Sequence, residues 1–253
     1  MDLRLSGRVF IVTGASAGIG EATVRLLTAE GAVVVGVARK PRRDEDVAAD
    51  VADRAAAQLV VDTVLERHGR LDGLVNNVGG LDSRTSFLDV SDDDWLATFD
   101  LNFHSVVRFS RAALPALTEH GGSLVHVASE AARFPDTSLV DYAAAKTALL
   151  SMSKTLAGEF GPRGVRSNVV SPGPTRTWLW DRPGGFADQL ADQFKLPVDE
   201  AIEHFVRDVR RLPSGRLGTP QEVAGVIAYL LSPLTSQVTG AEWAIDGGAL
   251  RQI

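Results

Sequence analysis

The chain has 253 residues, of which 45% are hydrophobic and 23% are charged, and it contains no cysteine. This length and balance predict one globular α/β domain with a sizeable core. The formal net charge of −6 argues against a protein that coats nucleic acid. The absence of cysteine excludes disulfides, thiolate metal sites and a cysteine nucleophile. With no signal-peptide pattern and no apolar stretch of about 20 residues, we expect a cytoplasmic protein without a membrane partner.

Short apolar segments rich in β-branched residues alternate with longer helical patterns. The expected strands are 9–12, 33–37, 71–75, 124–127 and 165–170, and the expected helices are about 18–30, 53–68, 91–119, 139–160 and 219–231. This alternation predicts βαβ units with right-handed crossovers. We therefore expect an α/β fold with a doubly wound, mainly parallel sheet and helices on both faces, formed as a single domain over residues 1–253.

The alternation breaks between about residues 174 and 218, where we expect an irregular insertion with one or two short helices. Its prolines and glycines interrupt a set of aromatic residues, namely Trp178, Trp180, Phe186 and Phe194. Two interpretations remain open. The insertion is either a helical pair that covers the sheet edge or a mobile lid over a pocket at the strand ends.

A glycine-rich turn, TGASAGIG over residues 13–20, follows the first strand and opens the first helix. Such a turn lets the backbone approach a pyrophosphate, whose charge the helix N-terminus binds. We expect the following residues of this turn to bind a dinucleotide: Gly14, Ser16, Gly18, Ile19 and Gly20. The same segment also satisfies G-x-S-x-G, the nucleophile elbow of serine hydrolases, with Ser16 as nucleophile. Against that alternative, no earlier strand–helix loop precedes it and no histidine stands out as a partner.

The residues after the second strand bear on the choice of dinucleotide. A site that prefers NAD usually presents a carboxylate here for the ribose 2′-hydroxyl. This chain has Ala38 and then the basic residues Arg39, Lys40, Arg42 and Arg43. Because a guanidinium attracts a 2′-phosphate, we favour NADP(H), with Arg39 as its contact, and keep NAD(H) as the alternative. The other interpretation is a solvated loop, since three acidic residues follow directly.

Tyr142 and Lys146 are separated by one turn at the start of a long helical pattern. This spacing places the phenol and the ammonium group on one helix face. A nearby cation favours the phenolate, so we expect Lys146, together with a bound nicotinamide, to lower the pKa of Tyr142 from about 10. Ser129 ends the strand 124–127, thirteen residues before Tyr142, where ligands bind in open α/β sheets.

The glycine-rich turn, Ser129, Tyr142 and Lys146, in this order and spacing, resemble the pattern of the short-chain dehydrogenase/reductase family. The resemblance covers essentially the whole chain. The resemblance implies a Rossmann-like single domain with Tyr142 as general acid/base, Lys146 and Ser129 as its partners, and Asn102 anchoring a water that relays protons. It also implies further contacts to the cofactor, listed as Asp50, Val51, Asn77, Val78, Gly79, Pro172, Gly173, Thr175 and Thr177, besides Tyr142 and Lys146 themselves.

The chain departs from the family pattern in several places, one of them Ala128, where the family often has a serine before the catalytic one. Val78 stands where the family usually has alanine, which predicts a slightly narrower cofactor pocket. Glu130 follows Ser129, and we favour a surface position for it, with a contact to substrate as the alternative. The stretch from Arg39 to Val51 leaves little room for the usual helix and strand.

The expected reaction is hydride transfer between NADP(H) and a ketone or alcohol. The aromatics of the insertion favour an apolar small-molecule substrate. The resemblance further implies a homo-oligomer, a tetramer or dimer, through the helices 91–119 and 139–160 and a C-terminal strand around Trp243. A non-catalytic dinucleotide-binding sensor is the remaining alternative. We expect no metal site and no nucleic-acid partner.

Overall fold

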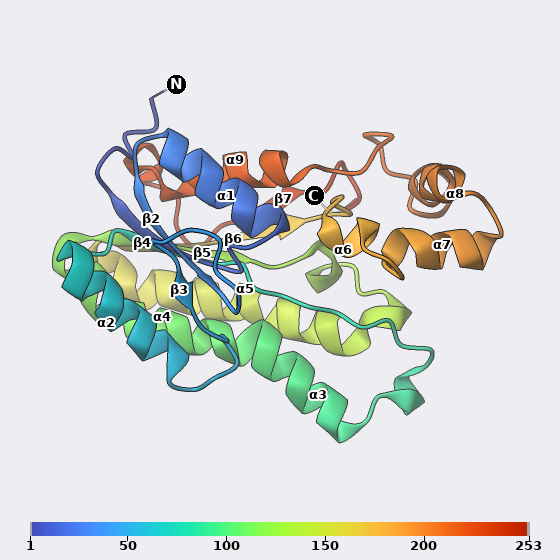
Figure 1. Cartoon of the computed structure of the whole chain (residues 1–253), viewed down its shortest axis with the longest axis horizontal. Helices are drawn as coiled ribbons and strands as arrows, with labels where there is room; N and C mark the ends of the chain where they lie inside the picture. The colour runs from blue at the N-terminus through green and yellow to red at the C-terminus, as the bar shows by residue number, and fades with distance from the viewer. Residues whose placement is uncertain (1, 252–253) are drawn as a thin grey trace.

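Within the described part of the chain, seven parallel strands form the sheet, in the spatial order β3-β2-β1-β4-β5-β6-β7 (Figure 1). The computed structural model describes residues 2–251. The strands are β1 (Val9–Thr13), β2 (Val33–Ala38), β3 (Val47–Ala48), β4 (Gly73–Asn76), β5 (Gly122–Val127), β6 (Val165–Pro172) and β7 (Glu242–Ile245). The helices are α1 (Gly18–Ala29), α2 (Ala56–His68), α3 (Asp92–Phe99), α4 (Ser105–His120), α5 (Val140–Phe160), α6 (Trp178–Asp181), α7 (Phe186–Phe194), α8 (Val198–His204) and α9 (Pro220–Leu231). The predicted doubly wound, Rossmann-like single domain is therefore confirmed.

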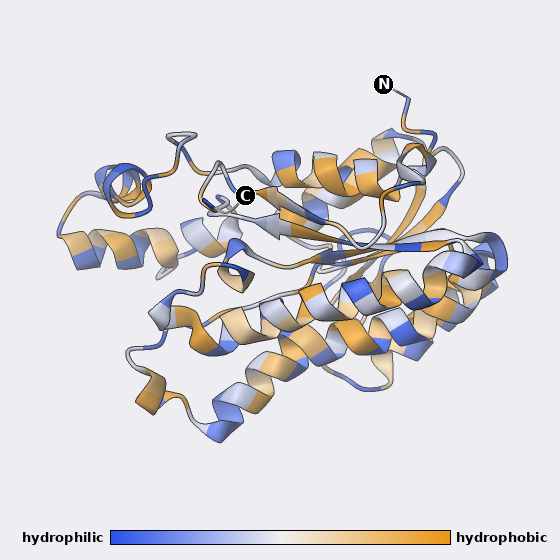
Figure 2. Cartoon of the chain, turned by 180° about the vertical axis from the view of Figure 1, so that it is seen from behind, coloured by the Kyte–Doolittle hydropathy of each residue, from blue (hydrophilic) through white to orange (hydrophobic). Residues whose placement is uncertain are grey.

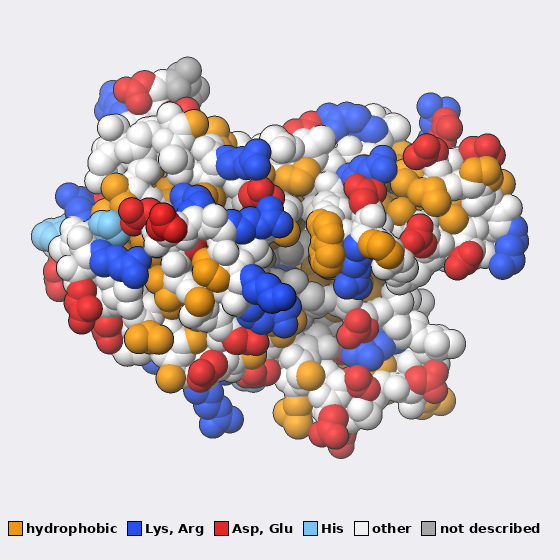
Figure 3. All heavy atoms as spheres, in the orientation of Figure 1, with side chains coloured by type: hydrophobic (Ala, Val, Ile, Leu, Met, Phe, Trp, Pro, Cys, Tyr) orange, Lys and Arg blue, Asp and Glu red, His pale blue; other side chains and the backbone are white. Residues whose placement is uncertain are grey.

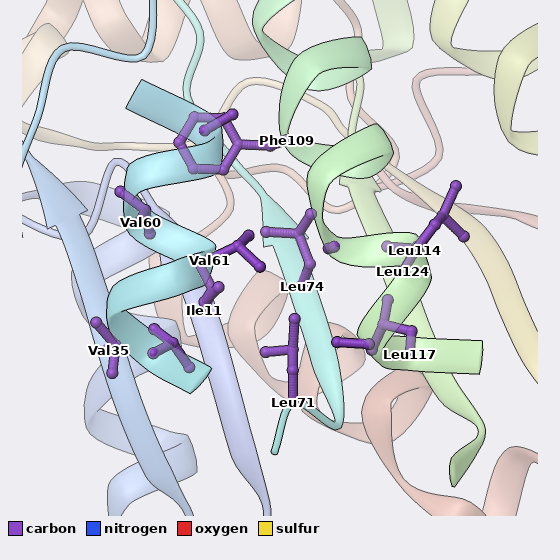
Figure 4. Close-up of a cluster of buried hydrophobic side chains, with 14 of the residues drawn as sticks. Ile11, Val35, Val60, Val61, Leu71, Leu74, Phe109, Leu114, Leu117 and Leu124 are labelled. Carbon is purple, nitrogen blue, oxygen red and sulfur yellow. The ribbon is translucent and has the colours of Figure 1, made fainter. Parts of the chain in front are cut away.

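Alternate residues of the central strands supply two separate hydrophobic cores. On one face, Val9 and Ile11 of β1 pack with α2 and α4, whose side chains Figure 4 shows against the sheet. On the other face, Phe10 and Val12 pack with α1 and α9. Seen from behind, hydrophobic residues run along the strands (Figure 2). Burial on both faces is why apolar residues dominate β1 and β2 in the sequence.

Side-chain caps fix the start of two helices. At α3, the Ser91 hydroxyl accepts a hydrogen bond from the Asp94 amide at 3.2 Å, and the Asp94 carboxylate accepts one from the Ser91 amide at 3.0 Å. Thr219 and Glu222 form the same reciprocal capping box at α9, with Pro220 in the first turn. Each box satisfies amides that a helix N-terminus otherwise leaves unpaired.

The segment between β2 and α2 is as short as the sequence indicates. It contains only the two-residue strand β3 and turns, within the described residues. The Asp46 carboxylate accepts a hydrogen bond from the Gly36 amide at 3.0 Å, and Arg43 pairs with the same carboxylate. This edge of the sheet is thus held by an ion pair instead of a crossover helix.

The insertion lies at one end of the molecule, beyond the carboxyl ends of the strands (Figure 1). It contains three short helices, α6, α7 and α8, followed by a π-helical turn over Phe205–Val209, so the expectation of one or two helices was too low. Gly185 and Pro197 are the N-cap residues of α7 and α8, so the residues that interrupt the aromatic set also mark where two helices begin. Trp180, Phe186 and Phe205 pack edge to face within the insertion's own core.

Candidate active site

The glycine-rich turn joins the end of β1 to the start of α1. Gly14 and Gly18 have φ angles of +69° and +56°, which favour glycine. A Cβ on Gly20 would lie 2.1 Å from the Gly14 carbonyl oxygen, so only glycine lets the helix pack this close to the turn. The N-cap residue, Ala17, provides no side-chain hydrogen bond, which leaves the first amides of α1 to bind another acceptor. These features fit the pyrophosphate of a dinucleotide. Ser16 and Ile19 lie half-buried in the same turn.

Two neighbouring loops meet this turn. The Asn77 side-chain amide donates to the Thr13 carbonyl at 3.0 Å, which joins the ends of β4 and β1. Val78 lies against Gly14, with 3.1 Å between its Cγ2 and a Cβ placed on that glycine. From the far side, the Thr177 side chain lies 3.3 Å from a Cβ placed on Gly18. The loops after β1, β4 and β6 therefore surround one space.

The loop after β6 is held in place by several contacts. The Gly173 amide donates to the Ile245 carbonyl at 3.0 Å, and a Cβ on Gly173 would lie 2.7 Å from Asp246 Cα. The Thr175 hydroxyl, which is buried, donates to the Gly173 carbonyl at 2.9 Å. Pro172 is the last residue of β6. The close approach of β7 explains why glycine is needed at this turn.

Asn102 lies in a π-helical turn, Asp100–His104, which interrupts the single helix predicted over 91–119. The side chain is fully buried; its amide donates to the carbonyls of Gly80 and Thr98 at 2.9 and 3.0 Å, and its Oδ1 accepts from the Gly80 amide at 3.1 Å. A Cβ on Gly79 would lie 3.2 Å from Asn102 Oδ1 and 3.1 Å from Lys146 Nζ. Asn102 and Lys146 thus flank the same glycine. Such π-turns are frequent at functional sites.

The Ser129 side chain lies close enough to the Tyr142 phenol to lower its pKa. The Ser129 oxygen accepts a hydrogen bond from the Ala131 amide at 3.2 Å, so its own hydrogen is free to point toward the phenol. Burial raises the pKa of the Tyr142 phenol above its ordinary value, the Ser129 side chain lowers it, and the negative charge of Glu130 raises it. The expectation that Lys146 lowers this pKa is therefore not met by the polypeptide alone. The desolvation of the phenol outweighs the stabilisation of its anion.

The Lys146 side chain is buried, and its ammonium group donates to the Val127 carbonyl at 2.9 Å. The nitrogen lies 5.7 Å from the centre of the Tyr142 ring. Burial lowers the pKa of Lys146 to about 8, because the charged form loses hydration. The lysine can therefore exchange a proton near neutral pH.

Asp141, which the sequence analysis missed, holds the start of α5 where Tyr142 lies. It is 1% exposed, and its carboxylate accepts hydrogen bonds from Arg84 at 2.6 Å and from the Thr98 hydroxyl at 2.8 Å. Burial raises the pKa of Asp141, but the bonds from Arg84, Thr98 and the Tyr142 amide outweigh it and hold the pKa below its usual value. The only signal in the sequence is an acidic residue within a helix start that is otherwise apolar.

Glu130 is also buried, so the favoured surface position for it was wrong. It is 7% exposed and forms an ion pair with Arg210, at the end of the insertion. Burial raises the pKa of Glu130, and the charge and hydrogen bond of Arg210 oppose that shift. The pair joins the loop after Ser129 to the insertion. No pattern in the sequence points to Arg210, since 80 residues separate it from Glu130.

The basic residues after β2 differ in whether their side chains have ion-pair or hydrogen-bond partners. Arg43 is bound to Asp46 and to the Val34 carbonyl, and Arg42 lies 3.5 Å from Glu21. Arg39 is exposed and has no hydrogen bond or ion pair to the described part of the chain. Further along, the side chain of Asp50 is exposed, whereas that of Val51 packs in the core.

His126 lies in a buried polar network beneath the site. Its two ring nitrogens lie 3.1 Å from the Asn76 amide and 3.1 Å from the Ser167 hydroxyl. Burial, with a smaller contribution from the charge of Lys146, lowers its pKa to about 3. Among residues 2–251, no histidine hydrogen-bonds to Ser16, which argues against the hydrolase alternative.

The surface is hollowed between the body of the sheet and the insertion, with Lys and Arg side chains beside the hollow (Figure 3). Within the described residues, no helix combines the length and hydropathy needed to cross a bilayer. The same part of the chain has no cluster of three or more histidine, aspartate or glutamate side chains able to hold a metal ion.

Comparison with known families decides the class of protein. The model of a family described as enoyl-(acyl carrier protein) reductase matches residues 14–249. The chain belongs to the short-chain dehydrogenase/reductase family. As a member of that family it is an oxidoreductase that uses a nicotinamide dinucleotide.

Similar members of the family differ in what they act on. The chain is 32% identical to a 3-oxoacyl-[acyl-carrier-protein] reductase of Thermotoga maritima, over 97% of this chain and 99% of that protein. It is 33% identical to meso-2,3-butanediol dehydrogenase of Serratia marcescens, over 98% of this chain and 96% of that protein. The structure of L-sorbose reductase from Gluconobacter frateurii, a complex with NADPH and L-sorbose, matches with a TM-score of 0.90 at 30% identity and full coverage of both chains.

Proposed function

We propose that this short-chain dehydrogenase/reductase transfers hydride between NADP(H) and a small carbonyl or alcohol, with Tyr142 as general acid/base. The observation that carries the proposal is the buried Lys146, whose ammonium group lies 5.7 Å from the centre of the Tyr142 ring, with Ser129 close enough to the phenol to lower its pKa. The glycine turn and the amides at the start of α1 would hold the pyrophosphate. When bound, the nicotinamide supplies or accepts the hydride.

The protein's own residues would move the proton. In reduction, the Tyr142 phenol donates its proton to the substrate oxygen, and Ser129 holds that oxygen by a hydrogen bond. Since burial alone raises the pKa of Tyr142, the phenolate needs positive charge close by. Lys146 supplies such charge below pH of about 8 and would bind the ribose hydroxyls. Asn102 would anchor a water through which Lys146 regains a proton.

The preference for NADP(H) over NAD(H) is part of the proposal. It is supported by the exposed Arg39 after β2 and by the absence of an acidic residue at the end of that strand. Asp50 and Val51 would lie at the adenine, and Asn77, Val78 and Gly79 along the ribose. The loop with Pro172, Gly173, Thr175 and Thr177 would meet the nicotinamide.

Further parts of the proposal concern the surroundings of the site. The insertion 174–218 would cover the substrate, and the chain would act as a cytoplasmic homo-oligomer. Leu96 on α3 and Leu88 just before this helix are apolar and exposed. This would fit a face of α3 that another subunit covers in a homo-oligomer. Trp180 and Phe186 pack within the insertion, so they give little support for an apolar substrate, whereas Trp178 remains exposed.

The test is a panel of ketones, aldehydes and alcohols, followed by nicotinamide absorbance with NADP(H) and with NAD(H). We expect turnover of a carbonyl or alcohol, faster with NADP(H). A chain that binds NADPH but turns over no member of the panel would instead be the non-catalytic sensor. Labelling of Ser16 by a fluorophosphonate would favour a hydrolase.

A further inference from the structure

The Glu130 carboxylate has one oxygen without a partner. Oε1 accepts a hydrogen bond from Arg210, whereas Oε2 is buried and has no hydrogen-bond partner among residues 2–251. The residue as a whole is more than nine-tenths buried. Buried polar atoms in folded proteins are nearly always hydrogen-bonded, because an unpaired one loses its hydration without compensation. A further donor is therefore expected at Oε2.

This oxygen belongs to a residue beside the proposed reaction centre. Glu130 directly follows Ser129 in the chain, and its negative charge raises the pKa of the Tyr142 phenol. A group bound to Glu130 would thus lie close to the substrate oxygen that Ser129 and Tyr142 hold. It would occupy the side of the site nearest the insertion, from which Arg210 comes.

The charges around Glu130 define the donor that fits. Arg210 is the cation paired with it and also lies 3.9 Å from the Asp136 carboxylate. The negative charges of Asp136 and Asp246 also act on Glu130. Arg210 already compensates the charge of Glu130, so a neutral hydroxyl donor satisfies Oε2 without adding a second buried cation.

We propose that Glu130 is a specificity-determining residue, whose Oε2 accepts a hydrogen bond from a hydroxyl group next to the reacting carbon. The preferred substrates would then be hydroxy ketones and the corresponding diols. This inference rests on the proposed function, since it takes the reacting oxygen to be held by Ser129 and Tyr142. In this proposal Glu130, and not the aromatic residues of the insertion, selects the substrate. Three of those aromatic residues pack against one another.

The test compares substrates that differ by this one hydroxyl. The kcat/KM for acetoin is divided by that for 2-butanone, and likewise for 2-hydroxycyclohexanone and cyclohexanone. We expect the wild-type chain to prefer the hydroxylated member by roughly 10- to 100-fold, the range of a hydrogen bond to a charged group. Glu130→Met, and Glu130→Met combined with Arg210→Met, should bring both ratios close to unity. Each ratio comes from one preparation, so a loss of folded protein cancels.

Asp136→Asn is the matched control, because this carboxylate also faces Arg210 but is half exposed. It should keep the wild-type ratios. A wild-type ratio close to unity, or a high ratio that survives both Glu130 variants, would overturn the inference while leaving the proposed function intact. If no carbonyl in either pair or in the wider panel were reduced, the proposed function would fail, and this inference with it.

Discussion

The ammonium group of Lys146 donates a hydrogen bond of 2.9 Å to the carbonyl of Val127, the last residue of β5. This bond brings helix α5 and the carboxyl edge of the sheet together at the point where Ser129 follows the strand. It also fixes a buried cation 5.7 Å from the Tyr142 ring. The geometry of the proposed proton transfer therefore depends on the packing of α5 against the sheet.

Replacing Lys146 by methionine should stabilise the fold while it reduces activity. Between about pH 8 and 10.5, Lys146 is protonated in the unfolded chain but has lost its proton in the native chain. The free energy of unfolding of the wild type therefore increases with pH over this range because of this group. At pH 7 the buried charge costs roughly 3 kcal/mol, and Lys146→Met should recover roughly 1–2 kcal/mol after losing the bond to Val127. We expect kcat to fall by about 10²-fold or more. Urea unfolding across this pH range checks the stability, with the exposed Lys154→Met as control; a wild-type pH slope that persists in Lys146→Met would contradict it.

His126 should make the fold sensitive to acid. Its pKa is lowered from 6.5 to about 3, so the unfolded chain binds a proton that the native chain excludes between these values. Stability from this group is present above about pH 6.5 and falls by about 1.4 kcal/mol for each pH unit below it. Urea unfolding should show a shallower loss in His126→Gln, and the full loss in the exposed control His120→Gln. Equal slopes in His126→Gln and wild type would disprove this assignment.

Asp141 and Arg84 should act as one unit that positions Tyr142. Arg84→Met leaves the buried Asp141 carboxylate without its ion pair and should cost about 3 kcal/mol or more in unfolding free energy, whereas Asp141→Asn should cost less, because Arg84 keeps its ion pair with Asp94. The double variant should cost less than the sum by about 1–3 kcal/mol. A double-mutant cycle measures this coupling, and additive losses would contradict it. We also expect kcat in Asp141→Asn to fall more than KM changes.

Arg39→Asp should shift the cofactor preference toward NADH. Losing a hydrogen bond between charged groups and adding a carboxylate should reduce kcat/KM for NADPH by roughly 10- to 100-fold relative to NADH. Arg25→Asp, an exposed basic residue on α1, controls for net charge and should keep the wild-type ratio. An unchanged ratio in Arg39→Asp would remove the argument for a 2′-phosphate contact.

The sheet could be predicted because β1, β2, β4, β5 and β6 are largely buried on both faces, so that apolar residues cluster at these places in the sequence. Ser129, Tyr142 and Lys146 could be placed because strand ends and helical spacing bring them to one edge. The ion pairs Glu130–Arg210 and Asp141–Arg84 could not, since 80 and 57 residues separate the partners and no local pattern links them. The π-helical turn at Asn102 could not be predicted from the spacing of apolar residues either. One extra residue in a single turn shifts that spacing only slightly.

The measurement that tests the account most directly is the turnover of Tyr142→Phe with the best carbonyl of the panel, together with its affinity for NADPH by fluorescence. The account predicts that kcat falls by about 10²- to 10⁴-fold while the affinity for NADPH stays within a few-fold of wild type. A variant that reduces the carbonyl at the wild-type rate would contradict the role of Tyr142 as general acid.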